Sequence, residues 1–150
     1  MNAISHAIRL ARECLIMKIM LDTNICIALI ARRPDRVVRR FASMEIGSVG
    51  ISAITLAELQ FGVAKSVHVE RNREALDQFT LPLVIAPFDE NAAKAYGHVR
   101  AFLERKGKPI GAADTMIAGH AIALGATLVT NNLSEFSRVP GLSAENWLAA

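Results

Sequence analysis

Three acidic residues lie at the boundaries of predicted elements, each amid apolar sequence. Asp22 directly follows the apolar run 18–21. Glu58 comes shortly after a second run of low polarity, 49–52, and Asp114 falls in the first turn of a late helix. Clustered carboxylates repel one another and are costly to bury unless a cation neutralises them. Without a histidine or cysteine cluster, such oxygens suit Mg²⁺ or Mn²⁺ better than zinc, and an ion held there could polarise a phosphodiester and activate water.

Each acid also has a purely structural explanation. Asp114 would gain stabilisation from the dipole at the N-terminus of its helix. Thr55 and Glu58 fit a capping box, in which the threonine is the N-cap residue and the glutamate stands three positions later. Asp22 is the hardest to explain in this way, because a strand end that runs directly into a helix is a typical active-site position in open α/β sheets.

Predicted strands and helices alternate along the chain, which favours a parallel sheet with helices on both faces. Apolar runs predict strands at 18–21, 49–52, 81–86 and 127–130. Aromatic residues make up only 5% of the chain, and this composition suits an aliphatic core between a parallel sheet and its helices. A length of 150 residues fits one domain. We therefore predict an α/β fold, a three-layer α/β/α domain over residues 17–150.

Residues 1–16 form an N-terminal extension with two open interpretations. Apolar residues recur at helical spacing, so a short amphipathic helix is one. Translation that starts at Met17 is the other. Charged residues interrupt the segment and no small-residue cleavage site follows, which argues against a signal peptide.

Composition narrows the partners and the compartment. The net charge of +3 permits an RNA or acidic partner without demanding one. No run approaches the roughly 20 apolar residues of a membrane span. Cys14 and Cys26 both fall in apolar helical patterns, so we expect two reduced thiols in a cytoplasmic protein.

Two other kinds of hydrolase have little support. The four histidines are scattered, and none pairs with a serine or cysteine at a spacing typical of a catalytic triad. His120 lies within the apolar pattern of its helix, which favours a packed side chain. A phosphatase of the haloacid-dehalogenase kind with Asp22 as nucleophile would place a second aspartate two residues on, where this chain has Asn24.

A cluster of arginines is the best candidate surface for a phosphate backbone. It consists of Arg32, Arg33, Arg36, Arg39 and Arg40. The cluster follows closely on the helix that begins beside Asp22, so one end of it would flank the acids. The alternatives are a solvated helix face or a contact for a protein partner.

Four motifs resemble the signatures of PIN-domain nucleases, in the expected order. They are Leu-Asp-Thr-Asn at 21–24, Ser-Ala-Ile-Thr-Leu-Ala-Glu-Leu at 52–59, the run 110–121 around Asp114, and Leu-Val-Thr-Asn-Asn at 128–132. The resemblance extends essentially from residue 17 to residue 147. It is closest to the VapC toxins of bacterial VapBC toxin–antitoxin pairs, in particular to the enterobacterial type that cuts initiator tRNA in its anticodon stem-loop.

The resemblance implies an activity and its partners. The chain would be a Mg²⁺-dependent endoribonuclease, with Mn²⁺ as a substitute, that is toxic when free and silenced by a bound VapB antitoxin. It would form a homodimer that joins larger toxin–antitoxin complexes. Asp22 and Asp114 would be metal ligands, and Glu58 would be the third acid.

One position departs from the family pattern. Asn132 stands where the family often has an aspartate, so the fourth position of the site falls to Asn132 itself or to Glu135. Thr23, Asn24 and Thr130 would orient ligands or water. The departure also motivates an alternative function, a degenerate PIN domain that binds RNA or a protein partner without cleaving.

Overall fold

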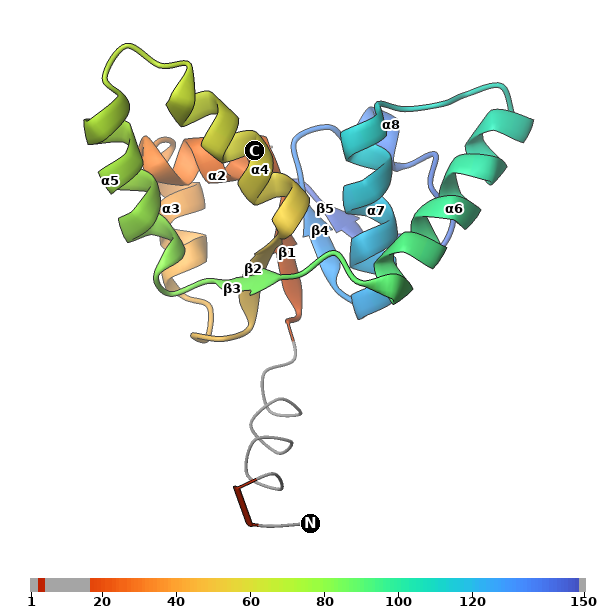
Figure 1. Cartoon of the computed structure of the whole chain (residues 1–150), viewed down its shortest axis with the longest axis horizontal. Helices are drawn as coiled ribbons and strands as arrows, with labels where there is room; N and C mark the ends of the chain where they lie inside the picture. Colours follow the sequence, from red (N-terminus) through yellow and green to blue (C-terminus); the bar gives the residue numbers. More distant parts are fainter. Residues whose placement is uncertain (1–2, 5–16, 149–150) are drawn as a thin grey trace.

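The structure is a computed structural model that describes residues 3–4 and 17–148 (Figure 1). The predictions for the extension 1–16 and for Cys14 therefore lie outside the described residues. Cys26 is a free, buried thiol, as expected, and burial raises its pKa well above the ordinary range. In the part of the chain that the structure describes, no helix is long and apolar enough to cross a membrane.

Five parallel strands form a single sheet in the order β3-β2-β1-β4-β5 (Figure 1). The strands are β1 Ile19–Leu21, β2 Val49–Ser52, β3 Val84–Ala86, β4 Thr127–Val129 and β5 Ala144–Glu145. The chain adds β2 and β3 on one side of β1 and then crosses over to add β4 and β5 on the other. The strand order therefore reverses between β1 and β4, and in open α/β sheets ligands bind beyond the carboxyl ends of the strands at such a point.

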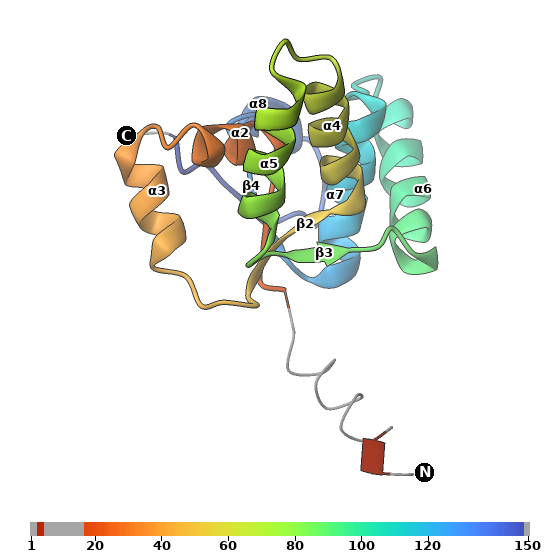
Figure 2. The same cartoon turned by 60° about the vertical axis from the view of Figure 1, so that its left-hand side comes forward.

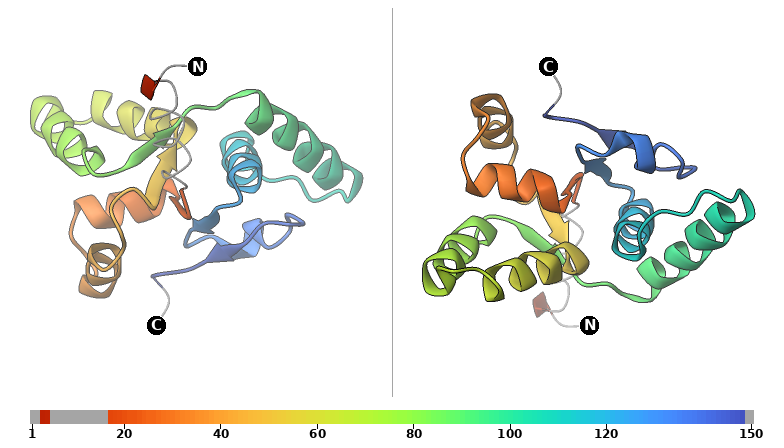
Figure 3. Two further views of the ribbon diagram at one scale, coloured as in Figure 1. Left: turned by 90° about the horizontal axis from the view of Figure 1, so that it is seen from below. Right: turned by 90° about the horizontal axis from the view of Figure 1, so that it is seen from above.

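Helices cover both faces of the sheet (Figures 1 and 3). They are α2 Thr23–Ile30, α3 Asp35–Ala42, α4 Ala53–Ala64, α5 Val69–Thr80, α6 Glu90–Arg105, α7 Ala112–Leu124 and the short α8 Leu133–Phe136. Figure 2 shows α2, α5 and α4 next to one another, with α7 and α6 packed together beyond α4. The predicted α/β/α arrangement with a parallel sheet is confirmed.

Alternation along the central strand divides the core into two clusters. Met20 of β1 packs into the cluster formed with α6 and α7, and its neighbour Leu21 packs into the cluster formed with α2, α3 and α5. Successive side chains of a strand point to opposite faces, so a buried strand between two helical layers must be apolar at consecutive positions. Both residues are fully buried. The short apolar run before Asp22 therefore anchors both layers.

The capping-box prediction for Thr55 and Glu58 is wrong. Helix α4 follows β2 with no intervening loop, so Ser52 at the strand end is the N-cap residue and its hydroxyl accepts a hydrogen bond from the Ile54 N–H at 3.1 Å. Thr55 is buried inside the helix, and Glu58 stands in the second turn. Helix capping therefore does not explain Glu58.

Helix α7 packs closely against α6 at Gly119. A Cβ atom on Gly119 would lie only 2.7 Å from the backbone nitrogen of Tyr96, so the two helices approach more closely than a larger side chain would allow. Gly125 then ends α7 in the left-handed conformation, with φ of 65°, which a glycine adopts without steric cost. Helix α7 is thus fixed at both its contact face and its C-terminus.

Candidate active site

Asp22 lies at the reversal of strand order and is held in a fixed orientation. Its backbone N–H donates to the carbonyl of Val129 in β4 at 2.8 Å, which continues the pairing of β1 with β4. Its carboxylate accepts two hydrogen bonds, from the Thr23 N–H at 2.8 Å and from the Thr130 hydroxyl at 2.7 Å. Asp22 is also the N-cap residue of α2, where the helix dipole favours a negative charge. The side chain is 5% exposed, so this is a nearly buried carboxylate.

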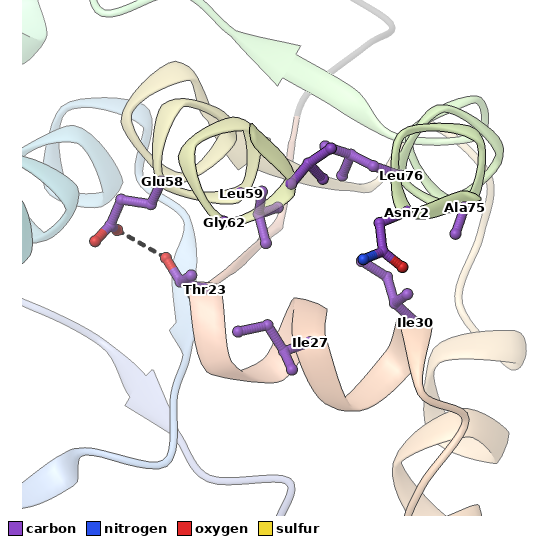
Figure 4. A pocket seen from close by; sticks show the side chains of 10 residues that line it. Thr23, Ile27, Ile30, Glu58, Leu59, Gly62, Asn72, Ala75 and Leu76 are labelled. Carbon is purple, nitrogen blue, oxygen red and sulfur yellow. Dashed lines mark hydrogen bonds between the residues drawn. The ribbon is translucent and has the colours of Figure 1, made fainter. Parts of the chain in front are cut away.

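Glu58 reaches the same place from the neighbouring helix. Its carboxylate accepts a hydrogen bond from the Thr23 hydroxyl at 2.7 Å, and Figure 4 shows the two side chains meeting between α4 and the start of α2. Thr23 thus contacts both acids, with its backbone N–H on Asp22 and its hydroxyl on Glu58. Glu58 itself is exposed, which leaves one face of its carboxylate open to a ligand.

Asp114 stands in the first turn of α7 and is half-buried. Burial is the main cause that raises the pKa of Asp114 to about 6. The negative charges of Asp22, Glu135 and Glu58 raise it further, in that order of importance. The carboxylates of these three residues therefore lie near enough to Asp114 for their charges to act on it. The structure therefore brings together the three acids that the sequence singled out, and adds Glu135 to them.

Asn132 and Glu135 form one unit rather than two alternatives. The Asn132 amide donates to the Glu135 carboxylate at 2.9 Å, and the Asn132 backbone N–H donates to the Thr130 hydroxyl at 3.0 Å. Since the same Thr130 hydroxyl donates to Asp22, a continuous path of hydrogen bonds leads from Asp22 to Glu135. Asn132 therefore holds the Glu135 carboxylate next to the turn after β4.

Asn131, which the sequence analysis did not single out, also joins the site. Its side-chain oxygen accepts a hydrogen bond from the amide of Asn24, at the start of α2, at 3.3 Å. This bond links the turn after β1 to the turn after β4. The position of Asn131 directly after a predicted strand was the available signal, since polar residues at the carboxyl end of neighbouring parallel strands meet at one edge of the sheet.

His120 is packed, as predicted, and it braces the site from behind. Its Nδ1 lies 2.8 Å from the hydroxyl of Ser52, and its ring meets Phe88 edge-on with ring centroids 5.3 Å apart. This contact joins α7, which carries Asp114, to the start of α4, which carries Glu58. Burial lowers the pKa of His120, so the neutral imidazole is favoured there.

The acids are not neutralised by cationic side chains. The ion pairs formed within residues 17–148 lie elsewhere: Arg40–Glu145, Arg73–Glu70 and Arg100–Glu104. The same residues contain no ready-made cage of three or more His, Cys, Asp or Glu side chains for a metal ion. Mg²⁺ does not need such a cage, because it keeps several waters and takes one or two carboxylates. Uncompensated carboxylates, one of them with a raised pKa, fit such an ion.

Two of the five arginines of the cluster contact the C-terminal segment. Arg36 donates to the backbone carbonyl of Leu148, while Arg40 pairs with Glu145 at 3.1 Å and lies 5.0 Å from the ring centroid of Trp147. The other members, Arg32, Arg33 and Arg39, are exposed. The cluster follows α2 in the chain, and its Arg40 reaches Glu145, whose backbone carbonyl accepts a hydrogen bond from the Thr130 N–H at 2.9 Å.

An apolar groove begins beside the acids. It has a volume of about 320 Å³ and runs between α2, α4 and α5, with the Thr23–Glu58 pair at one end (Figure 4). Its walls are mainly aliphatic and include Ile27, Ile30, Leu59, Val63 and Leu76. Ile27 is 52% exposed, so the groove leaves substantial apolar surface in water.

Comparison with known proteins agrees with this geometry. The family model for the PIN domain matches residues 19–142. The chain is 45% identical to the tRNA(fMet)-specific endonuclease VapC of Salmonella typhimurium over 131 residues, which cover 87% of this chain and 98% of the relative. It is 47% identical to ribonuclease VapC2 of Rickettsia felis, over 85% of this chain and 96% of that one.

Solved structures show the same fold over most of the chain. VapBC2 from Rickettsia felis, bound to a DNA fragment from its promoter, matches with a TM-score of 0.82 and 46% identity over 87% of this chain and 99% of that chain. DNA-bound VapBC from Salmonella typhimurium matches with a TM-score of 0.83 and 45% identity over 87% and 98% of the two chains. The chain therefore belongs to the PIN-domain family and, within it, to the VapC group.

Proposed function

We propose that this chain is the toxin of a toxin–antitoxin pair, an endoribonuclease that depends on Mg²⁺ and cleaves initiator tRNA in its anticodon stem-loop. The observation that carries the proposal is the group of Asp22, Glu58, Asp114 and Glu135, which come from different elements to one place and have no cationic partner among the described residues. Relatives of nearly the same length are named as ribonucleases and as tRNA(fMet)-specific endonucleases, which supports the substrate class.

Nucleases of this family generally need divalent metal ions, and the donor set here fits Mg²⁺ or Mn²⁺. We assign Asp22 and Asp114 as its ligands. When bound, the ion would stabilise developing charge on the phosphodiester and lower the pKa of water. Without it, burial and then the neighbouring carboxylates raise the pKa of Asp114 and disfavour its charged form.

The chain's own residues orient the reacting groups. Thr23 and Thr130 fix the two oxygens of Asp22 through their N–H and hydroxyl groups, so little reorganisation is needed when a ligand arrives. The Thr23 hydroxyl also holds Glu58, an exposed residue whose carboxylate is suited to accept a proton from water. Asn132 holds Glu135 in the same way.

We further propose that the protein is held silent by an antitoxin of the VapB type, that it forms homodimers within larger complexes, and that it acts in the cytoplasm. The structural relatives are complexes of the VapBC type, which supports the partner. The exposed apolar groove beside Glu58 offers a surface that a protein segment could cover. The domain that carries these properties is 17–150, with 1–16 as an extension.

The alternative, a PIN domain that binds RNA without cleaving it, was motivated by Asn132 alone. The hydrogen bond from Asn132 to Glu135 weakens that motive, because it holds a carboxylate beside Asn132. Isothermal titration of Mg²⁺ into the partner-free chain separates the two functions. Intact RNA binding without any Mg²⁺ binding would favour the alternative.

The direct test uses the purified full chain, freed of antitoxin, with initiator tRNA. We expect Mg²⁺ to permit cleavage within the anticodon stem-loop and EDTA to stop it. An elongator tRNA serves as the matched control for substrate choice. A chain that leaves both RNAs intact with Mg²⁺ and with Mn²⁺ would refute the proposed function.

A further inference from the structure

We propose that the turn between α6 and α7, together with the end of α8, binds the phosphate backbone of the RNA substrate. The surface consists of Arg105, Lys106, Lys108 and Arg138, and we call it the turn surface. This inference rests on the proposed ribonuclease function, and it assigns a place for the RNA that differs from the arginine cluster near α3.

The turn surface lies beside the acids because of the way α6 and α7 are connected. Helix α6 ends at Arg105 and α7 begins at Ala112, so the turn leads within a few residues to Asp114. Figure 1 shows this turn at the same end of the molecule as the start of α7 and the short helix α8. A guanidinium N–H of Arg138, just after α8, donates to the carbonyl of Pro109 in the turn at 3.5 Å. Residues from two segments therefore form one basic surface.

The charges of the turn surface have no acidic partner in the described structure. All four side chains belong to exposed residues. None of them takes part in an ion pair formed within residues 17–148, and the nearby Glu104 is already paired with Arg100 at 3.0 Å. Lys106 lies 5.7 Å from the ring centroid of Phe102, which leaves its charge free for a ligand. The acids of the active site repel the phosphates of an RNA backbone. Four cations near the acids, with no ion-pair partner among the described residues, would attract those phosphates and offset the repulsion.

A groove extends this surface along α6. It has a volume of about 600 Å³ and lies between α6, the C-terminal part of α7 and Pro140. Lys94, His98 and Arg105 line it at helical spacing, so they share one face of α6 over about 17 Å. No acidic side chain lines the groove. This charge pattern suits a polyanion, and the proposed ribonuclease function makes an RNA strand the occupant.

The arginine cluster near α3 is the competing surface, and the structure gives it a weaker case. Arg36 and Arg40 are engaged with the C-terminal segment, and Arg40 has a carboxylate partner in Glu145. The turn surface leads directly into the first turn of α7, which carries Asp114, whereas the arginine cluster follows the C-terminus of α2. Each surface has exposed cationic residues that can be replaced, so two variants that lose the same net charge can be compared.

The experiment measures the affinity of the full-length chain for a fluorescein-labelled anticodon stem-loop of initiator tRNA. EDTA is present, so binding is measured without cleavage, and KCl is varied between about 50 and 300 mM, over which phosphate contacts are strongly salt-dependent. The test variant is Lys106→Gln with Lys108→Gln. Its matched control is Arg33→Gln with Arg39→Gln, which removes the same net charge from exposed residues of the other surface. Thermal unfolding confirms that both variants are folded.

We expect the lysine variant to reduce the slope of log affinity against log salt by about 1.4, since each lost contact to single-stranded RNA contributes about 0.7. Its affinity at 100 mM salt should fall by about tenfold or more, whereas the arginine variant should change by less than about twofold. Equal losses in both variants, or an unchanged slope in the lysine variant, would overturn the inference. Loss of antitoxin binding with an unchanged RNA slope would likewise overturn it and assign the turn to a protein partner.

The outcome distinguishes this inference from the proposed function. If the wild-type chain cleaves the RNA with Mg²⁺ while the lysine variant keeps the wild-type slope and affinity, the function stands and the inference fails. If the wild-type chain binds with a slope that the lysine variant loses, yet cleaves nothing with Mg²⁺, the inference stands and the function fails.

Discussion

Removal of the charge at Asp114 should stabilise the protein in the absence of metal. Burial and the neighbouring carboxylates raise the pKa of Asp114 from its ordinary value of 3.8 to about 6, so the folded state holds the charged form less well than the unfolded state does. The penalty is absent below pH 4, grows as the pH rises towards 6, and is complete above pH 6. The free energy of unfolding of the wild-type chain therefore contains a term that decreases over this range.

The size of the effect follows from the pKa and the exposure. One pKa unit corresponds to about 1.4 kcal/mol, and Asp114 is only half-buried, so we discount the full difference to roughly 1–2 kcal/mol. Asp114→Asn removes the charge and keeps the shape. In EDTA at pH 7.5 we therefore expect the variant to be roughly 1–2 kcal/mol more stable than the wild type, and at pH 4 we expect the two to be equal.

Urea unfolding in EDTA at the two pH values measures this difference. Addition of Mg²⁺ provides the second half of the test, because an ion that binds only the folded state stabilises it in proportion to occupancy. The wild type should gain stability with Mg²⁺, and Asp114→Asn should gain little. A variant that is less stable than the wild type at pH 7.5, or whose advantage is the same at both pH values, would refute our account of the acid cluster.

Three further changes test other parts of the structure. Glu58→Gln keeps an oxygen that can accept from the Thr23 hydroxyl, so the stability of the variant should differ from that of the wild type by less than about 0.5 kcal/mol. Its RNA cleavage should fall by about 100-fold, because the carboxylate is lost. Near-normal cleavage would remove Glu58 from the site. Gly119→Ala should destabilise the chain by about 1–3 kcal/mol in urea unfolding, because its Cβ would clash with the backbone of α6, whereas Gly97→Ala, on an open face of α6, should stabilise it by about 0.5–1 kcal/mol. His120 has a lowered pKa, so the unfolded state takes up its proton first, and stability should fall as the pH decreases below 6.5. In the Asp114→Asn background, His120→Asn should abolish that decrease, and a decrease that persists would assign it to another group.

The sequence predicted the parts of the site that depend on local order. Asp22 follows a buried strand and precedes a helix, and these two neighbours place it at the sheet edge whatever the rest of the chain does. Asp114 was found in the first turn of its helix for a similar reason. In both cases the position relative to one element decides where the side chain lies.

Contacts between distant segments could not be predicted in this way. Thr55 and Glu58 have the spacing of a capping box, but β2 runs without a loop into α4 and Ser52 takes the cap. Strand β5 has only two residues, and it exists because Ala144 pairs with Leu128 in β4. The contact of Arg40 with Glu145 joins residues 105 positions apart, for which the local sequence has no pattern. The role of Asn132 likewise became visible only through its bond to Glu135.

The measurement that most directly tests the central claim is sequencing of RNA ends after brief expression of the chain in a bacterium, beside the Asp22→Asn variant at equal abundance. Asn at this position can still accept a hydrogen bond from Thr130 but lacks the charge that a cation requires. We predict that the wild-type chain produces new ends within the anticodon stem-loop of initiator tRNA and arrests growth, and that Asp22→Asn does neither. Growth arrest and the same RNA ends from both chains would contradict the claim that these carboxylates form the catalytic site.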